Sequence, residues 1–346
     1  MSFTDNEETL FTVNSWCKMS FIDNTYTQEM FGTCLTIAQS IGVCYGMKSD
    51  NLPSRQDVVD LYKSKGIGKM RKYYLDEEVL QALRGSNIEL ILDVAKETLP
   101  SLANANEATN WVNKYVTHYI QYVNMKYIIV GNEIHPDDNE AQYIFHALQN
   151  IQNAISSSNL QIKVSIAIDM TLIANSYPPN DGDFNDKSYI QPIINFLVNN
   201  GSPLLANVYP YFAYIGDEKN IPLVYALFTQ QGNNNLGYQN LVDAMLDSIY
   251  AALEKIGASN LQIVVSESGW PSQGGDGATI ENSATYYKNL IDHVKSGNGT
   301  PKRTGQTIDT YLFAMFDEDQ KPNVETEKHF GLFNPYKSPK YQIGFN

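Results

Sequence analysis

Residues 125–134 read Met-Lys-Tyr-Ile-Ile-Val-Gly-Asn-Glu-Ile, an apolar run that ends in an amide and a carboxylate. The segment Tyr127–Val130 is apolar or aromatic on both alternating faces, which is typical of a strand buried in a parallel sheet between layers of helices. Asn132 and Glu133 come directly after this strand. The stretch therefore predicts a parallel α/β sheet that presents polar groups at the carboxyl end of a strand.

Runs of the same kind recur along the chain and alternate with helical patterns. The other β-rich runs are Ile41–Gly46, Ile67–Tyr74, Ile88–Ala95, Ile162–Asp169, Leu204–Ala213, Leu261–Trp270 and Thr307–Asp319. Helical periodicity fills most of the intervals, at residues 53–66, 107–122, 139–157, 188–199, 239–256 and 280–296. Repeated strand–helix units of this number predict an α/β fold, a single (β/α)₈ TIM barrel, with an open doubly wound sheet as the alternative.

Residues 1–40 differ from the rest of the chain. Charged side chains, among them Asp5, Lys18 and Glu29, interrupt every apolar run, so this segment contains no convincing signal peptide. We expect residues 1–40 to be an atypical, poorly ordered leader outside the fold. Residues 41–346 contain no Gly/Ser-rich or Pro-rich linker, and we expect them to form one barrel domain.

Composition excludes several classes of function. The formal net charge is −14 and there is no Lys/Arg-rich run, so the chain would repel nucleic acids and anionic membranes. No apolar stretch reaches the roughly 20 residues that a membrane span needs. The cysteines form no CxxC pair and the histidines show no HxxxH spacing, so we expect no metal site.

Carboxylates stand at the ends of three predicted strands. Glu133 ends the fourth, Glu267 lies in Ser-Glu-Ser-Gly-Trp-Pro at the end of the seventh, and Asp317–Asp319 end the eighth. A single carboxylate there is most simply a rim salt bridge. However, active sites of such barrels gather at the carboxyl ends of the strands, and glycoside hydrolysis needs two carboxyl groups that face each other. The fourth and seventh strands lie across the ring from one another, so Glu133 and Glu267 are the candidate pair.

Two neighbours of these glutamates fit the same chemistry. Asn132 can donate a hydrogen bond to the 2-hydroxyl of a sugar, an interaction that strengthens in the transition state of glycoside hydrolysis. Trp270 can form the floor or wall of a sugar subsite, although a core tryptophan is an equally ordinary explanation.

Several longer motifs of the chain form a recognisable set. They are Leu83–Leu90, Val130–Glu133, Asn207–Phe212, Val264–Pro271, Tyr311–Glu318 and Glu327–Gly331. Through these motifs the chain resembles the plant β-1,3-glucanases, the seventeenth family of glycoside hydrolases. The similarity covers essentially everything after residue 40.

The resemblance implies a (β/α)₈ barrel, acting as a monomer without a metal or cofactor, that hydrolyses internal β-1,3-glucosidic bonds with retention in glucans such as callose, laminarin and fungal wall glucan. It implies that Glu133 is the acid/base and Glu267 the nucleophile. It further implies a supporting set of cleft residues. These are Glu318, Lys321 and Glu327, which orient or tune the pair, and the aromatic groove residues Tyr73, Tyr211 and Phe212.

Three alternatives stay open at the level of sequence. The substrate can be mixed-linkage β-1,3-1,4-glucan, because the catalytic residues would be the same. The barrel can also be a catalytically idle glucan-binding protein, although such a protein has no need to keep both glutamates. The family resemblance implies an extracellular or cell-wall location, with the vacuole as the alternative, and leaves defence and callose remodelling undecided.

Some positions depart from the usual family pattern. His135 follows the Gly-Asn-Glu motif where the family commonly has Ser, and a histidine beside the acid can shift its pKa. The segment Lys69–Asp76 is more basic and aromatic than the common Arg-Leu-Tyr-Asp-Pro version, which leaves substrate preference at that edge open. The glycosylation motifs at Asn200 and Asn298 are each followed by proline, which disfavours their use.

Overall fold

The computed structural model describes residues 41–230, 236–322 and 324–345. The expected leader, residues 1–40, lies outside these ranges, and the expectation stays a prediction. No helix in the described ranges is long and apolar enough to cross a membrane.

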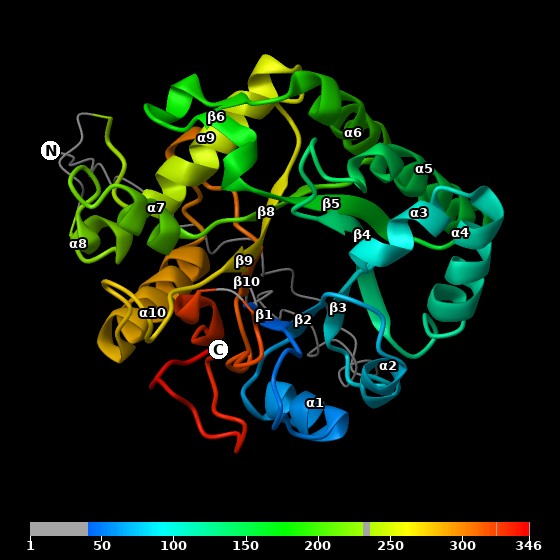
Figure 1. The fold of residues 1–346 in the computed structure, drawn as a ribbon, viewed down its shortest axis with the longest axis horizontal. Coiled ribbons are helices and arrows are strands. Elements are labelled where there is room, and N and C mark those ends of the chain that lie inside the picture. Colours follow the sequence, from blue (N-terminus) through cyan, green and yellow to red (C-terminus); the bar gives the residue numbers. More distant parts are fainter. Residues whose placement is uncertain (1–40, 231–235, 323, 346) are drawn as a thin grey trace, which may run out of the picture. The chain divides into compact units, whose positions relative to one another are not determined.

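Eight parallel strands close into a barrel at the centre of this domain (Figure 1). Around the ring they are β1 Gly42–Tyr45, β2 Lys69–Lys72, β3 Glu89–Asp93, β4 Asn124–Asn132, β5 Lys163–Asp169, β8 Leu204–Asn207, β9 Ile263–Ser268 and β10 Thr310–Leu312. The ring closes where β1 pairs with β10, through Gly42 opposite Tyr311 and Val43 opposite Leu312. This closure confirms the predicted barrel, and the open doubly wound alternative is wrong.

Helices surround the strands on the outside of the ring (Figure 1). They are α1 Arg55–Ser64, α2 Glu77–Ala82, α3 Leu99–Leu102, α4 Ala105–Trp111, α5 Ala141–Ser157, α6 Lys187–Asn200, α7 Pro210–Gly216, α8 Leu223–Ala226, α9 Leu241–Lys255 and α10 Ile280–Ser296. The bounds of α10 match the predicted range because local signals fix both ends. Thr279 accepts a hydrogen bond from the Asn282 amide at the start, and Gly297 adopts the left-handed conformation that ends helices.

The bounds of most predicted elements differ somewhat in the structure, and for two of them the chain shows a clear physical reason. The predicted strand Leu204–Ala213 ends at Asn207, because Pro210 starts α7, where its fixed φ and missing amide hydrogen suit the first helical turn. The predicted helix 107–122 is α-helical only to Trp111 and continues as a π-helical segment, Val112–Thr117. The wider turn rotates later side chains away from the 3.6-residue pattern, and Tyr122 is exposed.

A short antiparallel hairpin lies outside the barrel, between β5 and α6. It consists of β6 Ile173–Asn175 and β7 Asp183–Phe184 and was not predicted. Gly182, next to β7, packs so closely against the Ser248 carbonyl of α9 that a Cβ atom would collide with it. Phe184 is buried, so this hairpin is fixed to the barrel at the end of β5.

Side chains alternate across the barrel wall, and this alternation positions the site. Along β2, Met70 belongs to the layer packed between strands and helices. Arg71 faces the opposite way, into the barrel, where it meets groups from β3, β8 and β9. Lys72 faces outward again. The inner apolar cluster, which includes Cys44, Ile91, Ile129, Leu205 and Tyr311, fills the barrel interior.

Candidate active site

A cleft of about 700 Å³ lies over the carboxyl ends of the barrel strands. Residues at or after β1, β2, β4, β5, β8, β9 and β10 line it, from Gly46 after β1 to Glu318 after β10. A second hollow, of about 500 Å³, lies around the loops that precede β8 and β9. Its one carboxylate, Asp309, already pairs with Lys69 and Lys126. The first cleft is therefore the one that offers carboxyl groups for chemistry.

Glu133 comes directly after β4 and has an uncommon backbone conformation. Its φ is 52°, in the left-handed region, and its amide donates to the Ala167 carbonyl of β5 at 2.9 Å. A non-glycine residue in this region costs about 1 kcal/mol or more and persists only where the surroundings hold it. This conformation turns the Glu133 side chain toward the cleft, where Asn207 Nδ2 donates to its Oε1 at 2.7 Å.

Glu267 lies within β9, and its side chain is almost completely buried. Two groups donate to its carboxylate: Arg71 Nη1 to Oε1 at 2.9 Å and the Tyr209 hydroxyl to Oε2 at 2.6 Å. Burial, followed by the charge of Glu267, holds the pKa of Tyr209 well above its ordinary value, so the phenol keeps its proton. Both oxygens of Glu267 thus accept hydrogen bonds, and the two donors fix the orientation of the carboxyl group.

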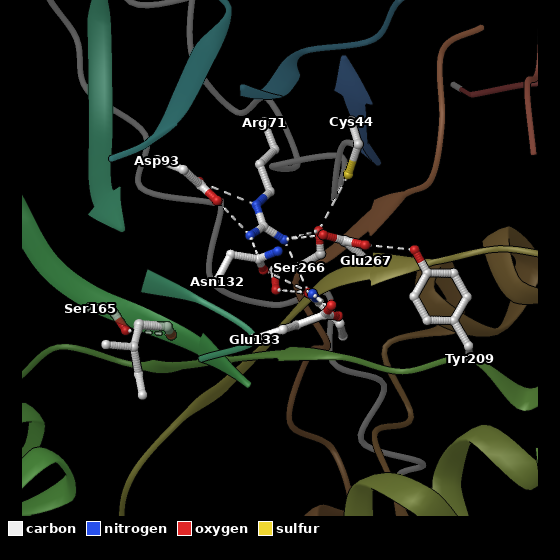
Figure 2. Close-up of polar contacts among 11 residues, drawn as sticks. Cys44, Arg71, Asp93, Asn132, Glu133, Ser165, Tyr209, Ser266 and Glu267 are labelled. Atoms are coloured by element: carbon white, nitrogen blue, oxygen red, sulfur yellow. Dashed lines mark hydrogen bonds and ion pairs between the residues drawn. The ribbon is translucent and has the colours of Figure 1, made fainter. Parts of the chain in front are cut away.

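Arg71 organises the floor of the site (Figure 2). Its guanidinium has no exposed surface and donates to Asp93 at 2.7 Å and to Asn132 Oδ1 at 2.8 Å, besides Glu267. Burial alone would lower the pKa of Arg71, but Asp93, Tyr73 and Glu267 together raise it well above its ordinary value. The side chain of a buried cation with this many acceptors is held in one position, so Arg71 sets the positions of the groups around it.

Asn207, the last residue of β8, links the two glutamates. Its Oδ1 accepts from Arg71 Nη1 at 3.0 Å and from the Ser266 hydroxyl at 2.7 Å. These two donors fix the orientation of the amide, so that Nδ2 faces Glu133 and, at 3.0 Å, Asn132 Oδ1.

The two glutamates have different electrostatic surroundings. Burial, followed by the nearby charge of Glu267, raises the pKa of Glu133 from 4.5 to about 7, with Asp169 adding to the effect and Asn207 opposing it. Glu133 is therefore a protonated carboxyl group in mildly acidic solution. Glu267, in contrast, accepts from the Arg71 guanidinium and from the Tyr209 hydroxyl. Environments that separate two carboxyl groups in this way assign one as acid and the other as anion.

Most of the predicted site residues meet in this cleft. Its lining includes Tyr73, Asn132, Glu133, Phe212, Glu267, Glu318, Lys321 and Glu327. Lys321 Nζ lies 3.4 Å from Glu318 Oε2 and 3.1 Å from Glu327 Oε2, so these three form one ion-paired group on the β10 side.

Two predicted site residues do not reach the cleft surface. Tyr211 and Trp270 have no exposed surface, and their rings pack against each other with centroids 5.1 Å apart. The Trp270 indole donates to the Gly277 carbonyl at 2.9 Å, which holds the ring in the core. For Trp270 the structure has the second of the two explanations, a core tryptophan. The expectation that Tyr211 lies along the groove is wrong, because its ring is buried and packs against Phe212 with centroids 5.4 Å apart.

His135, the neighbour of the Gly-Asn-Glu motif, contacts a carboxylate other than Glu133. Its Nε2 meets Asp169 Oδ2 and the Thr171 hydroxyl, both at 3.0 Å. Asp169 is in turn one of the charges that raise the pKa of Glu133. An effect of His135 on the proton of Glu133 stays a prediction.

Sequence reasoning missed four residues of the site: Arg71, Asp93, Asn207 and Tyr209. A signal was present for two of them, because Arg71 and Asp93 are charged residues near the carboxyl ends of predicted strands. Asn207 lies inside the predicted strand Leu204–Ala213 and ends only the observed β8. Nothing in the local sequence of Tyr209 indicates that its hydroxyl meets Glu267.

A carboxylic acid and a carboxylate facing each other over the open end of a barrel are what cleavage of a glycosidic bond requires, which makes the protein a glycoside hydrolase by class. The chain belongs to the glycosyl hydrolases family 17, whose family model matches residues 41–345.

Relatives of known name and structure agree with this assignment. A glucan endo-1,3-beta-glucosidase of Nicotiana tabacum, acidic isoform GL153, is 56% identical over 317 residues, which cover 89% of this chain and 88% of the relative. A glucan endo-1,3-beta-glucosidase of Vitis vinifera is 57% identical over 321 residues, covering 89% and 92%. Among solved structures, CJP38, a beta-1,3-glucanase and allergen of Cryptomeria japonica pollen, superposes with a TM-score of 0.85 at 48% identity, covering 89% and 99%.

A second solved structure comes from a comparison of two plant beta-glucan endohydrolases with distinct substrate specificities. It has a TM-score of 0.83 and 37% identity, and the match covers 88% of this chain and 100% of that one. The same barrel thus supports more than one specificity among similar plant enzymes.

Proposed function

We propose that this protein is an endo-acting β-1,3-glucanase that works by double displacement, with Glu133 as acid/base and Glu267 as nucleophile. The observation that carries the proposal is the pairing of a Glu133 carboxyl group, whose pKa is raised to about 7, with a Glu267 carboxylate held by two donors. The names of the tobacco and grapevine relatives support β-1,3-glucan as the substrate.

In the first step, Glu133 gives its proton to the glycosidic oxygen while Glu267 attacks the anomeric carbon. Arg71 and Tyr209 hold the attacking carboxylate in place, so little reorganisation is needed as one of its oxygens forms a bond to the anomeric carbon. The bond to the leaving sugar breaks and an ester to Glu267 forms. As Glu267 loses its negative charge, the pKa of Glu133 falls, which prepares it for the second step.

In the second step, the ionised Glu133 takes a proton from water as the water oxygen attacks the anomeric carbon of the ester. The bond between this carbon and Glu267 breaks, which releases Glu267 as a carboxylate and leaves Glu133 protonated again. Two inversions give net retention of configuration. Asn132 supports both steps from beside Glu133, where its side chain is fixed by Arg71 and Asn207 and can meet a sugar hydroxyl. Each step needs only these side chains, the substrate and water.

The walls of the cleft suit a neutral polymer. Tyr73, Phe212 and Phe313 supply aromatic surface, and Glu318, Lys321 and Glu327 supply groups that bind hydroxyls. Flat apolar faces combined with hydrogen-bonding groups are the usual means of binding sugar rings. We further propose that the protein acts as a monomer on extracellular or cell-wall glucan, with the vacuole as the alternative location.

The test is reducing-sugar release from laminarin and from mixed-linkage barley glucan, measured side by side with the full chain near pH 5. Rapid conversion of laminarin into a ladder of oligomers supports the proposal. A preference for the barley glucan would transfer the assignment to a mixed-linkage glucanase. A folded protein that binds laminarin without cleaving it would contradict the proposal in favour of a glucan-binding role.

A further inference from the structure

Lys72, the last residue of β2, is buried with an unpaired charge. It is 1% exposed and lies in the layer between the strands and the helices. Within the described part of the chain, its Nζ has no hydrogen-bond partner. A lysine ammonium that is removed from water without a carboxylate in contact is costly, and a methionine of similar length would fill the same space without that cost.

Two aromatic rings take the place of an anion around this ammonium. Lys72 Nζ lies 3.4 Å from the centroid of the Tyr74 ring and 5.9 Å from that of Tyr45. The negative face of an aromatic ring attracts a cation, and the attraction is larger when the cation is desolvated. Burial lowers the pKa of Lys72 to about 8, so the ammonium stays charged at the mildly acidic pH at which Glu133 is protonated.

Tyr74 connects this buried charge to the cleft. Its side chain is 38% exposed, although its neighbour Lys72 is not, and it lines the same cleft as Glu133 and Glu267. The Lys72 ammonium covers one face of the ring, so the exposed part of the ring is left for a ligand in the cleft. Tyr73, one residue earlier, lies deeper, with its ring over the Arg71 guanidinium at 4.8 Å.

We propose that Tyr74 is a specificity-determining wall of the cleft that binds a sugar unit of the glucan chain, and that Lys72 is a positioning residue that holds its ring. The inference rests on the proposed glucanase function and extends it to the substrate-binding surface. Lys72 does not contact Glu133 or Glu267, and no other part of the cleft requires a positive charge at this position. Its charge therefore acts through the ring that it covers.

The test compares three single variants, Tyr74→Ala, Tyr74→Phe and Lys72→Met, by kcat and KM on laminarin and on laminarihexaose. Tyr74→Ala should raise KM about 3- to 10-fold, because stacking surface is lost, and leave kcat within about 2-fold. Tyr74→Phe keeps the ring, so its KM should rise less than that of Tyr74→Ala. Lys72→Met should raise KM about 2- to 5-fold, with a melting temperature equal to or above that of the wild type, because an unpaired buried charge is removed.

A double variant shows whether Lys72 acts through Tyr74. In the Tyr74→Ala background, Lys72→Met should cause no further rise in KM, whereas independent roles would make the two effects multiply. An active wild type whose KM is unchanged by Tyr74→Ala, or a multiplicative double variant, would overturn this inference alone. Wild-type inactivity on both glucans would contradict the proposed function before any variant is compared.

Discussion

The Arg71 guanidinium donates to the Glu267 carboxylate across 2.9 Å in a site where Arg71 has no exposed surface. The same guanidinium forms an ion pair with Asp93, and Asn207 accepts from it while donating to Glu133. The proposed nucleophile, Glu267, thus contacts this buried cation directly, and the proposed acid, Glu133, is connected to it through Asn207. We infer that the distance and the electrostatic difference between the two glutamates are set by Arg71.

Replacing Arg71 tests this role. In Arg71→Met, Asp93 remains buried without its partner, and we expect the free energy of unfolding to fall by about 3–5 kcal/mol, with loss of most activity. Urea denaturation gives the measurement. Arg84→Met, at an exposed position in the turn after α2, is the matched control and should change stability by no more than about 0.5 kcal/mol. Equal stability of the two variants would show that the buried network is not what holds this part of the barrel.

Tyr209→Phe removes one of the two donors to Glu267 and keeps the ring. Because a hydrogen bond to a charged group is lost in a buried site, we expect kcat to fall about 10- to 100-fold with little change in KM. A fall in affinity without a fall in kcat would instead place Tyr209 among the residues that only bind substrate.

The pH profile depends on the proton of Glu133. Its pKa of about 7 in the free protein predicts that kcat/KM falls as the pH rises through about 7, since the acid is then ionised. Asp169 raises this pKa, so Asp169→Asn should lower it and move the fall in kcat/KM to lower pH. The control is Asp292→Asn, on the exposed surface of α10, which should leave the profile in place. A shift toward higher pH in Asp169→Asn would contradict the assignment of Glu133 as the acid.

The raised pKa of Glu133 also affects stability. Below pH 4.5 the group is protonated in both the folded and the unfolded chain. Between pH 4.5 and about 7 only the folded chain keeps the proton, so folding becomes less favourable as the pH rises, by up to about 3 kcal/mol in total. Glu133→Gln cannot lose a proton, and its stability relative to the wild type should be greater at pH 7.5 than at pH 4. A stability difference that is the same at both pH values would show that Glu133 is not protonated in the folded protein.

Sequence was sufficient for the barrel and for the two glutamates because the signals are local. An apolar run followed by a polar residue marks a strand end, and the end of a parallel strand is the active edge of a barrel. Glu133 and Glu267 could both be found in this way. The ends of α10 were equally predictable, because Thr279 and Gly297 act on their immediate neighbours.

The remaining site residues depend on contacts between distant parts of the chain. Arg71 is 22 positions from Asp93 and 196 from Glu267, and only closure of the barrel brings them together. Its burial therefore could not be inferred from β2 alone. Trp270 and Phe212 illustrate the same limit, since both are aromatic residues of family motifs, but only the packing of α7 decides that one is buried and the other lines the cleft.

The most direct test of the central claim is the anomeric configuration of the first product, followed by proton NMR during hydrolysis of laminarihexaose. Double displacement through Glu267 predicts that new reducing ends appear first as the β-anomer and reach the α/β equilibrium only later, by mutarotation. Glu267→Gln should release no product under the same conditions. New reducing ends that appear first as the α-anomer would show single displacement by water and would contradict Glu267 as the nucleophile.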